Sequence, residues 1–434
     1  HAMRLLLALV LACCASVACG PAPRPPAAAP SPAPAPSAAA PSAGAPSAAA
    51  PSAAAPSGAA PSGATPSGAA PAAAAFELVE TVPAGTTLDH PELRDAADVW
   101  LELITRARRS IDLGQFYASN HQPGRLEPII AALEAAARRG VIIRFLVEQS
   151  FVKVYPDTLD RLARAGVIVR HLDLKAVPGA GGILHAKYFV IDGREAFFGS
   201  QNFDWRALDH NYELGARTTD PGVVAGLAAV FASDWARAGG EPAPDVRLPD
   251  TTGAIRFVAS PRALLPPGVA WDLPAIIGLL DAARSTITVE ALGYLAGSWD
   301  ELEAPLRRAA ARGVHVQLLL ADWSKRKKTI GGLQQLARTP NIEVRLTTIP
   351  EDASGFIPFA RVTHAKALVV DGARAWLGTS NWERDYFYAT RNVGAIIDDP
   401  AIAAELARFF TTLWQSTYAV PVDPDARYIP PRTE

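Results

Sequence analysis

The sequence predicts an α/β protein made of two similar αβα-sandwich halves, which arise by internal duplication and share one active site on a pseudo-two-fold axis. Three observations predict this fold: a polar motif that occurs twice, apolar strands that alternate with helices, and the same order of elements in both halves. Such alternation is typical of a sheet with helices on both faces. We expect a signal peptide over 1–19, a linker over 20–75, a first half over 76–250 and a second half over 251–434.

The repeated motif is a His, one residue, a Lys, four residues and an Asp, followed by Gly-Ser/Thr-x-Asn. The first copy consists of His185, Lys187, Asp192, Ser200 and Asn202, and the second consists of His364, Lys366, Asp371, Thr379 and Asn381. A lone His beside a Lys on an apolar strand is usually structural, because short motifs give false matches. Repetition with the same spacing favours two halves that build one site.

The elements of the first half follow from the spacing of its apolar residues. A helix is predicted where such residues recur every three or four positions between 96 and 107. Further helices are predicted over 127–139 and 157–165, and strands over 111–117, 141–147 and 167–172. Gly140 and Gly166 follow the two later helices, where a left-handed cap is favoured.

The second half repeats this order. Helices are predicted over 273–284, 302–312, 330–337 and 401–415, and strands over 286–292, 314–320, 342–349 and 392–397. The Pro-rich segment 241–267 lacks a periodic pattern, so we expect it to join the two halves near residue 250.

The N-terminal residues have a different composition. Arg4 precedes an apolar run that ends at Ala18, which is typical of a secretion signal. The residues up to Cys19 resemble a bacterial lipobox and imply a diacylated Cys19, although Ser16 replaces the usual Leu, so that ordinary signal cleavage is the alternative. Residues 22–75 are almost entirely Ala, Pro, Ser and Gly and are expected to form a disordered tether. We therefore expect a secreted or cell-envelope protein, a bacterial lipoprotein.

The cysteine and charge content excludes some classes of site. All three cysteines lie in the signal segment, so we expect no disulfide and no zinc–thiolate site in the globular part. The chain has 41 Lys and Arg residues against 43 Asp and Glu residues. This balance provides no global basic field of the kind that indicates nucleic-acid binding.

Both copies of the motif are expected to bring their polar side chains to one face. A His and a Lys two residues apart on a strand point the same way. Asp192 and Asp371 each precede a Gly, a pair typical of a hairpin turn, so we interpret them as structural turn residues. The strand after each turn then carries Asn202 or Asn381 back toward the same face.

Two imidazoles, two ammonium groups and two carboxamides around one point suit a phosphodiester. The Lys and Asn side chains can hold the non-bridging oxygens as charge develops. One neutral His attacks phosphorus while the other, protonated, donates to the leaving oxygen. Carboxylate clusters at ligand spacing are absent near the motifs, so we expect no metal and no cofactor.

The doubled motif resembles the phospholipase D superfamily, and the resemblance covers essentially all of 76–434. The segments 199–206, 357–366 and 378–382 resemble the branch that contains lysosomal exonuclease-type and poxvirus envelope members. The resemblance implies the fold, a covalent phosphohistidine, and a substrate that is single-stranded nucleic acid or phospholipid.

The superfamily commonly has an acid downstream of the first motif that orients the catalytic His. Glu213 stands at that place, and Asn392 stands at the matching place in the second half. A carboxylate stabilises an imidazolium better than an amide does. The resemblance thus implies that Glu213 orients His185 as the nucleophile, that His364 is the general acid and that Asn392 is structural.

Two groups of residues are candidates for contact with the substrate. Lys325, Arg326, Lys327 and Lys328 follow a buried strand, where α/β folds place ligands, and can grip a phosphate backbone or an anionic membrane; a solvated charge run is the alternative. The aromatic residues Trp205, Trp382 and Tyr386 follow the motifs and can stack on bases or line an acyl groove, with burial in the core as the alternative.

Three functions remain open from the sequence. The first is a phospholipase D-type hydrolase or transphosphatidylase, favoured because a lipid anchor would hold it beside phospholipid. The second is a secreted, metal-independent nuclease acting on single-stranded nucleic acid. The third is a non-catalytic phosphodiester-binding protein, which the intact His, Lys and Asn of both copies disfavour. A monomer is sufficient for all three.

Overall fold

The computed structural model describes residues 75–249 and 253–434. The predicted signal peptide, the tether and Cys19 lie outside the described residues. Within the described part of the chain, no helix is long and apolar enough to cross a membrane.

The first half is built on an eight-stranded sheet in the order β2-β1-β10-β8-β7-β3-β5-β6. Its strands are β1 (Phe76–Thr81), β2 (Arg94–Asp95), β3 (Ser110–Gln115), β5 (Ile142–Glu148), β6 (Ile168–Leu172), β7 (Tyr188–Ile191), β8 (Glu195–Gly199) and β10 (Glu213–Thr218). The neighbours β3, β5 and β6 run parallel, and β7 runs antiparallel to β3. Helices α2 (Ala96–Arg106), α3 (Leu126–Arg138) and α4 (Pro156–Arg164) pack their apolar residues against one face of this sheet.

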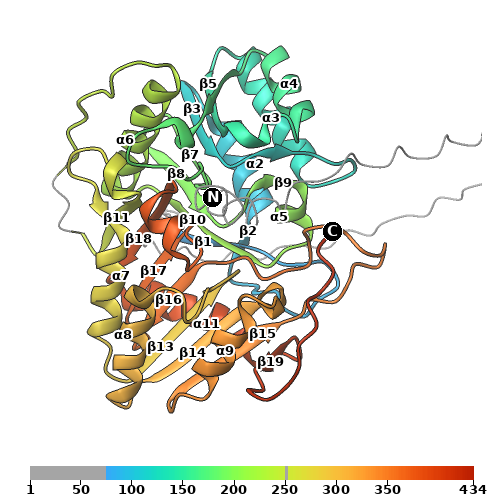
Figure 1. The fold of residues 1–434 in the computed structure, drawn as a ribbon. Coiled ribbons are helices and arrows are strands. Elements are labelled where there is room, and N and C mark those ends of the chain that lie inside the picture. Colours follow the sequence, from blue (N-terminus) through green and yellow to red (C-terminus); the bar gives the residue numbers. More distant parts are fainter. Residues whose placement is uncertain (1–74, 250–252) are drawn as a thin grey trace, which may run out of the picture. The chain divides into compact units, whose positions relative to one another are not determined.

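The second half repeats this plan with nine strands in the order β12-β11-β18-β17-β16-β13-β14-β15-β19. They are β11 (Ile255–Ser260), β12 (Ala270–Trp271), β13 (Thr286–Ala291), β14 (His315–Ala321), β15 (Ile342–Thr347), β16 (Ala367–Val370), β17 (Arg374–Gly378), β18 (Asn392–Ile397) and β19 (Ala419–Pro421). Helices α7 (Asp272–Asp281), α8 (Asp300–Ala311) and α9 (Ile330–Ala337) cover one face. Figure 1 shows both sheets with their outer helices.

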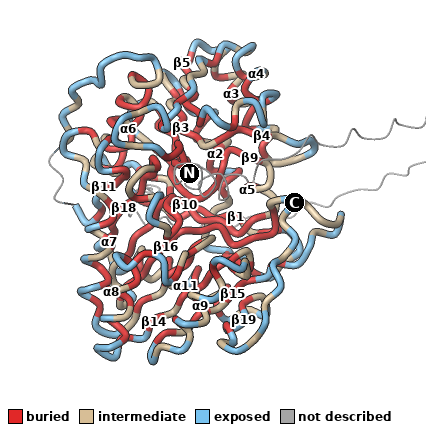
Figure 2. The backbone as a smooth tube through the Cα atoms, viewed as in Figure 1, coloured by how far each residue is buried: buried red, intermediate tan, exposed pale blue. Residues whose placement is uncertain are grey.

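A third core joins the two halves. Helices α6 (Pro221–Ala238) and α11 (Pro400–Gln415) contribute apolar side chains to one cluster with strands of both sheets. In Figure 2 the buried backbone follows the strands of both sheets, while much of the outer surface is exposed. The predicted fold of two αβα halves is confirmed.

The structure adds a strand that the sequence did not predict in the segment between the halves. Residues 241–267 show no periodic pattern, yet β11 lies within them and pairs with β18 along its whole length. The strand has six residues, too few to show a period, and Pro261 directly after it made the segment read as a loop. Strand β1 was also missed, because it follows the Ala-rich stretch directly and no turn residue marks its start.

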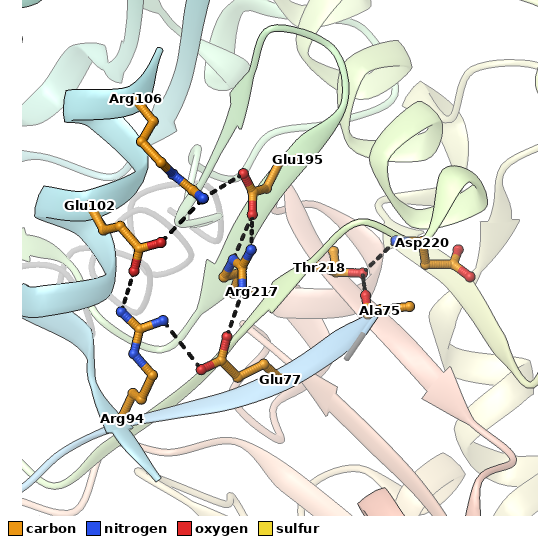
Figure 3. Close-up of polar contacts among 9 residues, drawn as sticks. All are labelled: Ala75, Glu77, Arg94, Glu102, Arg106, Glu195, Arg217, Thr218 and Asp220. Atoms are coloured by element: carbon orange, nitrogen blue, oxygen red, sulfur yellow. Dashed lines mark hydrogen bonds and ion pairs between the residues drawn. The ribbon is translucent and has the colours of Figure 1, made fainter. Parts of the chain in front are cut away.

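A closed ring of ion pairs fastens α2 to the strands of the first sheet (Figure 3). Arg217 contacts Glu77 and Glu195, Arg106 contacts Glu195 and Glu102, and Arg94 contacts Glu102 and Glu77. Single exposed ion pairs contribute little, but alternating charges in a ring share each partner. The ring links β1, β8 and β10. The motif residues Ser200 and Asn202 follow directly after β8.

Candidate active site

The two halves exchange backbone contacts beside the motif histidines. The backbone N–H of His185 donates to the carbonyl of Arg391 over 3.0 Å, and that of His364 donates to the carbonyl of Tyr212 over 2.8 Å. Two parallel bridges, Leu184 with Arg391 and Tyr212 with Thr363, complete this arrangement. Each His therefore lies beside the residue that begins β10 or β18 in the opposite half.

These bridges give the histidines partners from the opposite half. Nδ1 of His364 lies 2.7 Å from Oε2 of Glu213, and Nδ1 of His185 lies 3.0 Å from Oδ1 of Asn392. The prediction that Glu213 orients His185 is therefore wrong. Glu213 follows the first motif along the chain, but the bridge between Tyr212 and Thr363 turns its side chain toward the second.

The contacts of Asn392 determine the tautomer of His185. The Nδ2 of Asn392 donates to the carbonyls of Tyr386 and Thr390, so its Oδ1 faces the imidazole. Because that oxygen only accepts hydrogen bonds, Nδ1 of His185 must carry the proton. The lone pair of the neutral ring then resides on Nε2, which is the atom available for attack.

Glu213 is a fully buried carboxylate. Burial raises its pKa to about 7, against the opposing effects of Lys366, Ser200 and Asn211. Its second oxygen, Oε1, accepts from Nδ2 of Asn211 over 3.3 Å. Oε1 of Glu213 thus contacts Asn211, and Oε2 contacts the imidazole of His364.

The two motif lysines are completely buried and act on both histidines. Each Nζ donates to the backbone carbonyl of the His in its own motif. Burial lowers the pKa of both ammonium groups, that of Lys366 to about 7, and the charge of Lys366 lowers the pKa of Lys187 further. Burial together with both lysines also lowers the pKa of His185 and of His364. With the contacts from His185 to Asn392 and from His364 to Glu213, this mutual effect is consistent with two motif copies that face each other.

The motif hydroxyl and amide residues lie on the turns after β8 and β17. The hydroxyls of Ser200 and Thr379 accept from the backbone N–H groups of Leu214 and Val393 and so hold the strands that carry Glu213 and Asn392. Asn202 and Asn381 are buried, and the Oδ1 atom of each lacks a hydrogen-bond partner. Both amides thus have unused hydrogen-bonding capacity.

Both motif aspartates lie in turns. Asp192 and Asp371 have φ angles of 53° and 55°. The carboxylate of Asp192 accepts from the backbone N–H groups of 108–110, and that of Asp371 accepts from those of 284–286. These contacts tie the motif hairpins to the starts of β3 and β13.

The residues predicted to contact substrate lie in different environments. Tyr386 packs edge-on against His185, with ring centroids 4.9 Å apart, and Phe116, which the sequence did not single out, packs on the same ring at 5.2 Å. Trp205 is half-buried. Trp382 is 1% exposed and packs against Tyr294 in the core of the second half, in line with the alternative of burial in the core; its contact with substrate stays a prediction.

The basic run follows β14, as predicted. Lys325 contacts Asp322 and Thr348, and Arg326 lies over the ring of Trp323. Lys327 and Lys328 are exposed. Among residues 75–249 and 253–434, no group of three or more His, Cys, Asp or Glu side chains is placed to hold a metal ion.

Comparison with known proteins agrees with this geometry. The family model "Cardiolipin synthase, PLD-like domain" matches residues 100–235 and 276–414, one segment in each half. "Phospholipase D Z" of Dictyostelium discoideum is 30% identical, with 80% of this chain and 91% of that protein covered. Human "5'-3' exonuclease PLD3" is also 30% identical, with 80% and 81% covered.

A solved structure supports the fold alone. The phosphatidylserine synthase of Haemophilus influenzae superimposes with a TM-score of 0.58 at 11% identity, covering 75% of this chain and 84% of that chain. The repeated family match, the relatives and the paired motifs lead to one conclusion: the chain belongs to the phospholipase D superfamily and is a phosphodiesterase of that superfamily.

Proposed function

We propose that the chain hydrolyses phosphodiester bonds of single-stranded nucleic acid through a covalent phosphohistidine, with His185 as nucleophile and His364 as general acid. The observation that carries these roles is the unequal support of the two rings: a neutral amide faces His185 and a carboxylate faces His364. An amide leaves an imidazole neutral, as a nucleophile requires, while a carboxylate favours the imidazolium that a general acid requires.

In the first step, the Nε2 lone pair of His185 attacks phosphorus, an N–P bond forms and the P–O bond to the leaving group breaks. His364 donates its Nε2 proton to the departing oxygen, which leaves as a hydroxyl group. Lys187, Lys366, Asn202 and Asn381 hold the non-bridging oxygens as negative charge develops. The anionic substrate also offsets the repulsion that both ammonium groups exert on the imidazolium.

In the second step, neutral His364 takes a proton from water, and the resulting hydroxide attacks phosphorus. The N–P bond breaks, and the lone pair returns to Nε2 of His185. Throughout both steps the Nδ1 proton of His185 stays in its hydrogen bond with Asn392, so the ring cannot rotate away. The cycle ends with both histidines in their starting states.

The proposed substrate rests on the relatives. Human PLD3 and mouse PLD4, at 30% and 29% identity, are both named 5'-3' exonucleases. Phospholipid is the second candidate, because the Dictyostelium relative is named a phospholipase D. The predicted lipid anchor at Cys19 also favours phospholipid, since it would keep the enzyme beside a membrane.

The test is to incubate the protein with a 5'-labelled single-stranded oligonucleotide in EDTA, quench at alkaline pH, where the N–P bond survives, and map the adduct. We expect cleavage and an adduct on His185, neither of which forms in His185→Ala. His171→Ala, which changes an exposed histidine outside the site, serves as the matched control. An adduct on His364 would refute the roles. Release of head group from phosphatidylglycerol liposomes without cleavage of the oligonucleotide would select the second candidate.

A further inference from the structure

The loops that follow β5 and β14 occupy equivalent positions in the two halves. Within the sheets, Ile111 pairs with Ile191 of the first motif strand and with Ile143, while Ile287 pairs with Val370 of the second motif strand and with Val316. This shared register makes β5 equivalent to β14 residue by residue. The segments that begin at 149 in the first half and at 322 in the second therefore leave their sheets at equivalent points.

Both loops lie at the edge of the sheet where the histidines lie. Strand β7 is antiparallel to β3, and its first residue, Tyr188, pairs with Gly114 near the carboxyl end of β3. The His185 that precedes β7 is thus beyond the carboxyl ends of β3 and of its parallel neighbour β5. The same relation holds for His364 with β13 and β14. The two equivalent loops flank one pair of histidines.

The loop of the first half is aromatic and continuous with His185. Phe116, which packs on His185, lies 4.5 Å from Phe151 between ring centroids and 5.2 Å from Tyr117. Tyr117 stacks on Tyr155 at 5.1 Å. Phe116 and Tyr155 are half-buried, so each presents part of its ring to solvent.

A second group of residues extends this aromatic surface. The guanidinium of Arg206 lies 5.9 Å from the ring of Tyr155 and 5.2 Å from the ring of half-buried Trp205. Buried Asp204 accepts from both Arg206, over 2.6 Å, and the hydroxyl of Tyr117, over 2.7 Å. Asp204 lies two positions after the motif residue Asn202. Its contacts with Arg206 and Tyr117 therefore connect this aromatic surface to the motif.

The loop of the second half is basic. Lys325 and Arg326 are held by neighbouring residues, whereas Lys327 and Lys328 are exposed. The two loops therefore differ in balance: aromatic side chains gather around the first, which also carries exposed Lys153, whereas exposed Lys327 and Lys328 dominate the second.

We infer that the aromatic surface around the loop after β5 and the basic run after β14 form the two walls of a binding site for single-stranded nucleic acid, an inference that rests on the proposed nuclease function. Bases stack on the aromatic wall formed by Phe116, Tyr155 and Trp205, and backbone phosphates lie along Lys327 and Lys328. A single strand presents its bases and its charges on different sides, which matches one aromatic and one cationic wall. Stacking is available to every base, so this site binds without a fixed sequence.

The test measures binding of a labelled single-stranded 12-mer, and of an abasic 12-mer with the same phosphates, by fluorescence anisotropy in a His185→Ala background. Tyr155→Ala combined with Trp205→Ala is expected to weaken binding of the normal strand roughly tenfold or more and to leave the abasic strand unchanged. Lys327→Ala with Lys328→Ala is expected to weaken both strands alike and to reduce the salt slope by about 1.4. Arg138→Ala with Arg164→Ala, exposed at the opposite edge of the first sheet, is the charge-matched control.

A small substrate separates this inference from the proposed chemistry. Bis(p-nitrophenyl) phosphate reaches the histidines without the walls, so its hydrolysis by the unmodified chain reports the chemistry separately from binding. The Arg138→Ala/Arg164→Ala control, which lies outside the site, should hydrolyse it at the normal rate. If the unmodified chain does not hydrolyse bis(p-nitrophenyl) phosphate while the double variants bind the oligonucleotides as expected, the proposed two-histidine mechanism is refuted and the binding walls are supported. If the chain hydrolyses it but oligonucleotide binding survives both double variants, the walls are refuted. Loss of phosphatidylglycerol-vesicle binding with intact oligonucleotide binding in the Lys327/Lys328 variant would also overturn the inference.

Discussion

The residues that support the two histidines determine how activity depends on pH. Catalysis requires neutral His185 and protonated His364, and burial with both lysines lowers both pKa values below the ordinary 6.5. Neutral His185 is present above its lowered pKa, and protonated His364 is lost as the pH rises through its own. We therefore expect kcat/KM to be highest near neutral pH. It should fall toward alkaline pH, where His364 and Lys366, the latter with a pKa of about 7, lose their charges, and toward acid pH, where Glu213, with a pKa of about 7, loses the charge that supports His364. A pH–rate profile with its maximum above pH 8 would contradict this.

Exchanging the two supporting groups should move opposite limbs of that profile. Glu213→Gln removes the carboxylate from His364, so the alkaline limb should move to lower pH and kcat at pH 7 should fall roughly tenfold or more. Asn392→Asp is the matched variant: a carboxylate beside His185 raises its pKa, so the acid limb should move to higher pH. An unchanged alkaline limb in Glu213→Gln would show that the carboxylate does not govern the acid.

At the scale of the element, each motif hairpin depends on its aspartate. Asp371→Ala removes the acceptor of three backbone N–H groups at a positive φ, so we expect a loss of about 1–3 kcal/mol in the free energy of unfolding. Asp371→Asn should lose less, because Asn also accepts these bonds and tolerates positive φ. Urea unfolding measures the stability, and kcat per folded molecule should stay unchanged. A large fall in kcat at normal stability would assign the aspartate to the chemistry instead.

Elements bounded by clear start and stop residues could be predicted from the sequence even when they are short, and elements next to Pro-rich segments could not. Helix α9 and strand β18 have the predicted bounds, because periodic spacing and terminal residues agree there. Strand β11 was hidden by neighbouring Pro residues. The partners of the histidines were beyond prediction for a different reason: Glu213 and Asn392 have the same spacing from their motifs, and that spacing does not say which half a side chain turns toward. Only the pairing of Tyr212 with Thr363 decides this.

At the scale of the whole molecule, a buried ion pair fastens the halves together. The guanidinium of Arg391 contacts Asp234 on α6 over 2.7 and 2.9 Å and donates to the carbonyls of Ser260 and Leu264, with both charged side chains fully buried. The backbone of Arg391 also holds His185. The duplication could be predicted from the repeated motif. The Arg391–Asp234 ion pair could not, because it has no counterpart in the first half, where Tyr212 occupies the position of Arg391.

Removing one partner of that pair should be costly. Arg391→Met leaves the carboxylate of Asp234 buried without its main partner, and we expect a loss of roughly 3–5 kcal/mol in the free energy of unfolding. Arg391→Met with Asp234→Leu replaces both charges by apolar groups and should recover much of that loss. Guanidinium unfolding of the single and double variants provides the comparison. Equal losses in both would show that the charges matter less than the shape of the two side chains.

The exchanged partners also impose an order on biosynthesis. Asn392 lies 207 residues beyond His185, and His364 lies 151 residues beyond Glu213. A domain generally begins to fold while the ribosome is still making the rest of the chain. The first half can then form its sheet early, yet its histidine stays unoriented until the last strands emerge. A growing chain therefore carries no assembled phosphodiester-cleaving centre near the transcript from which it is translated.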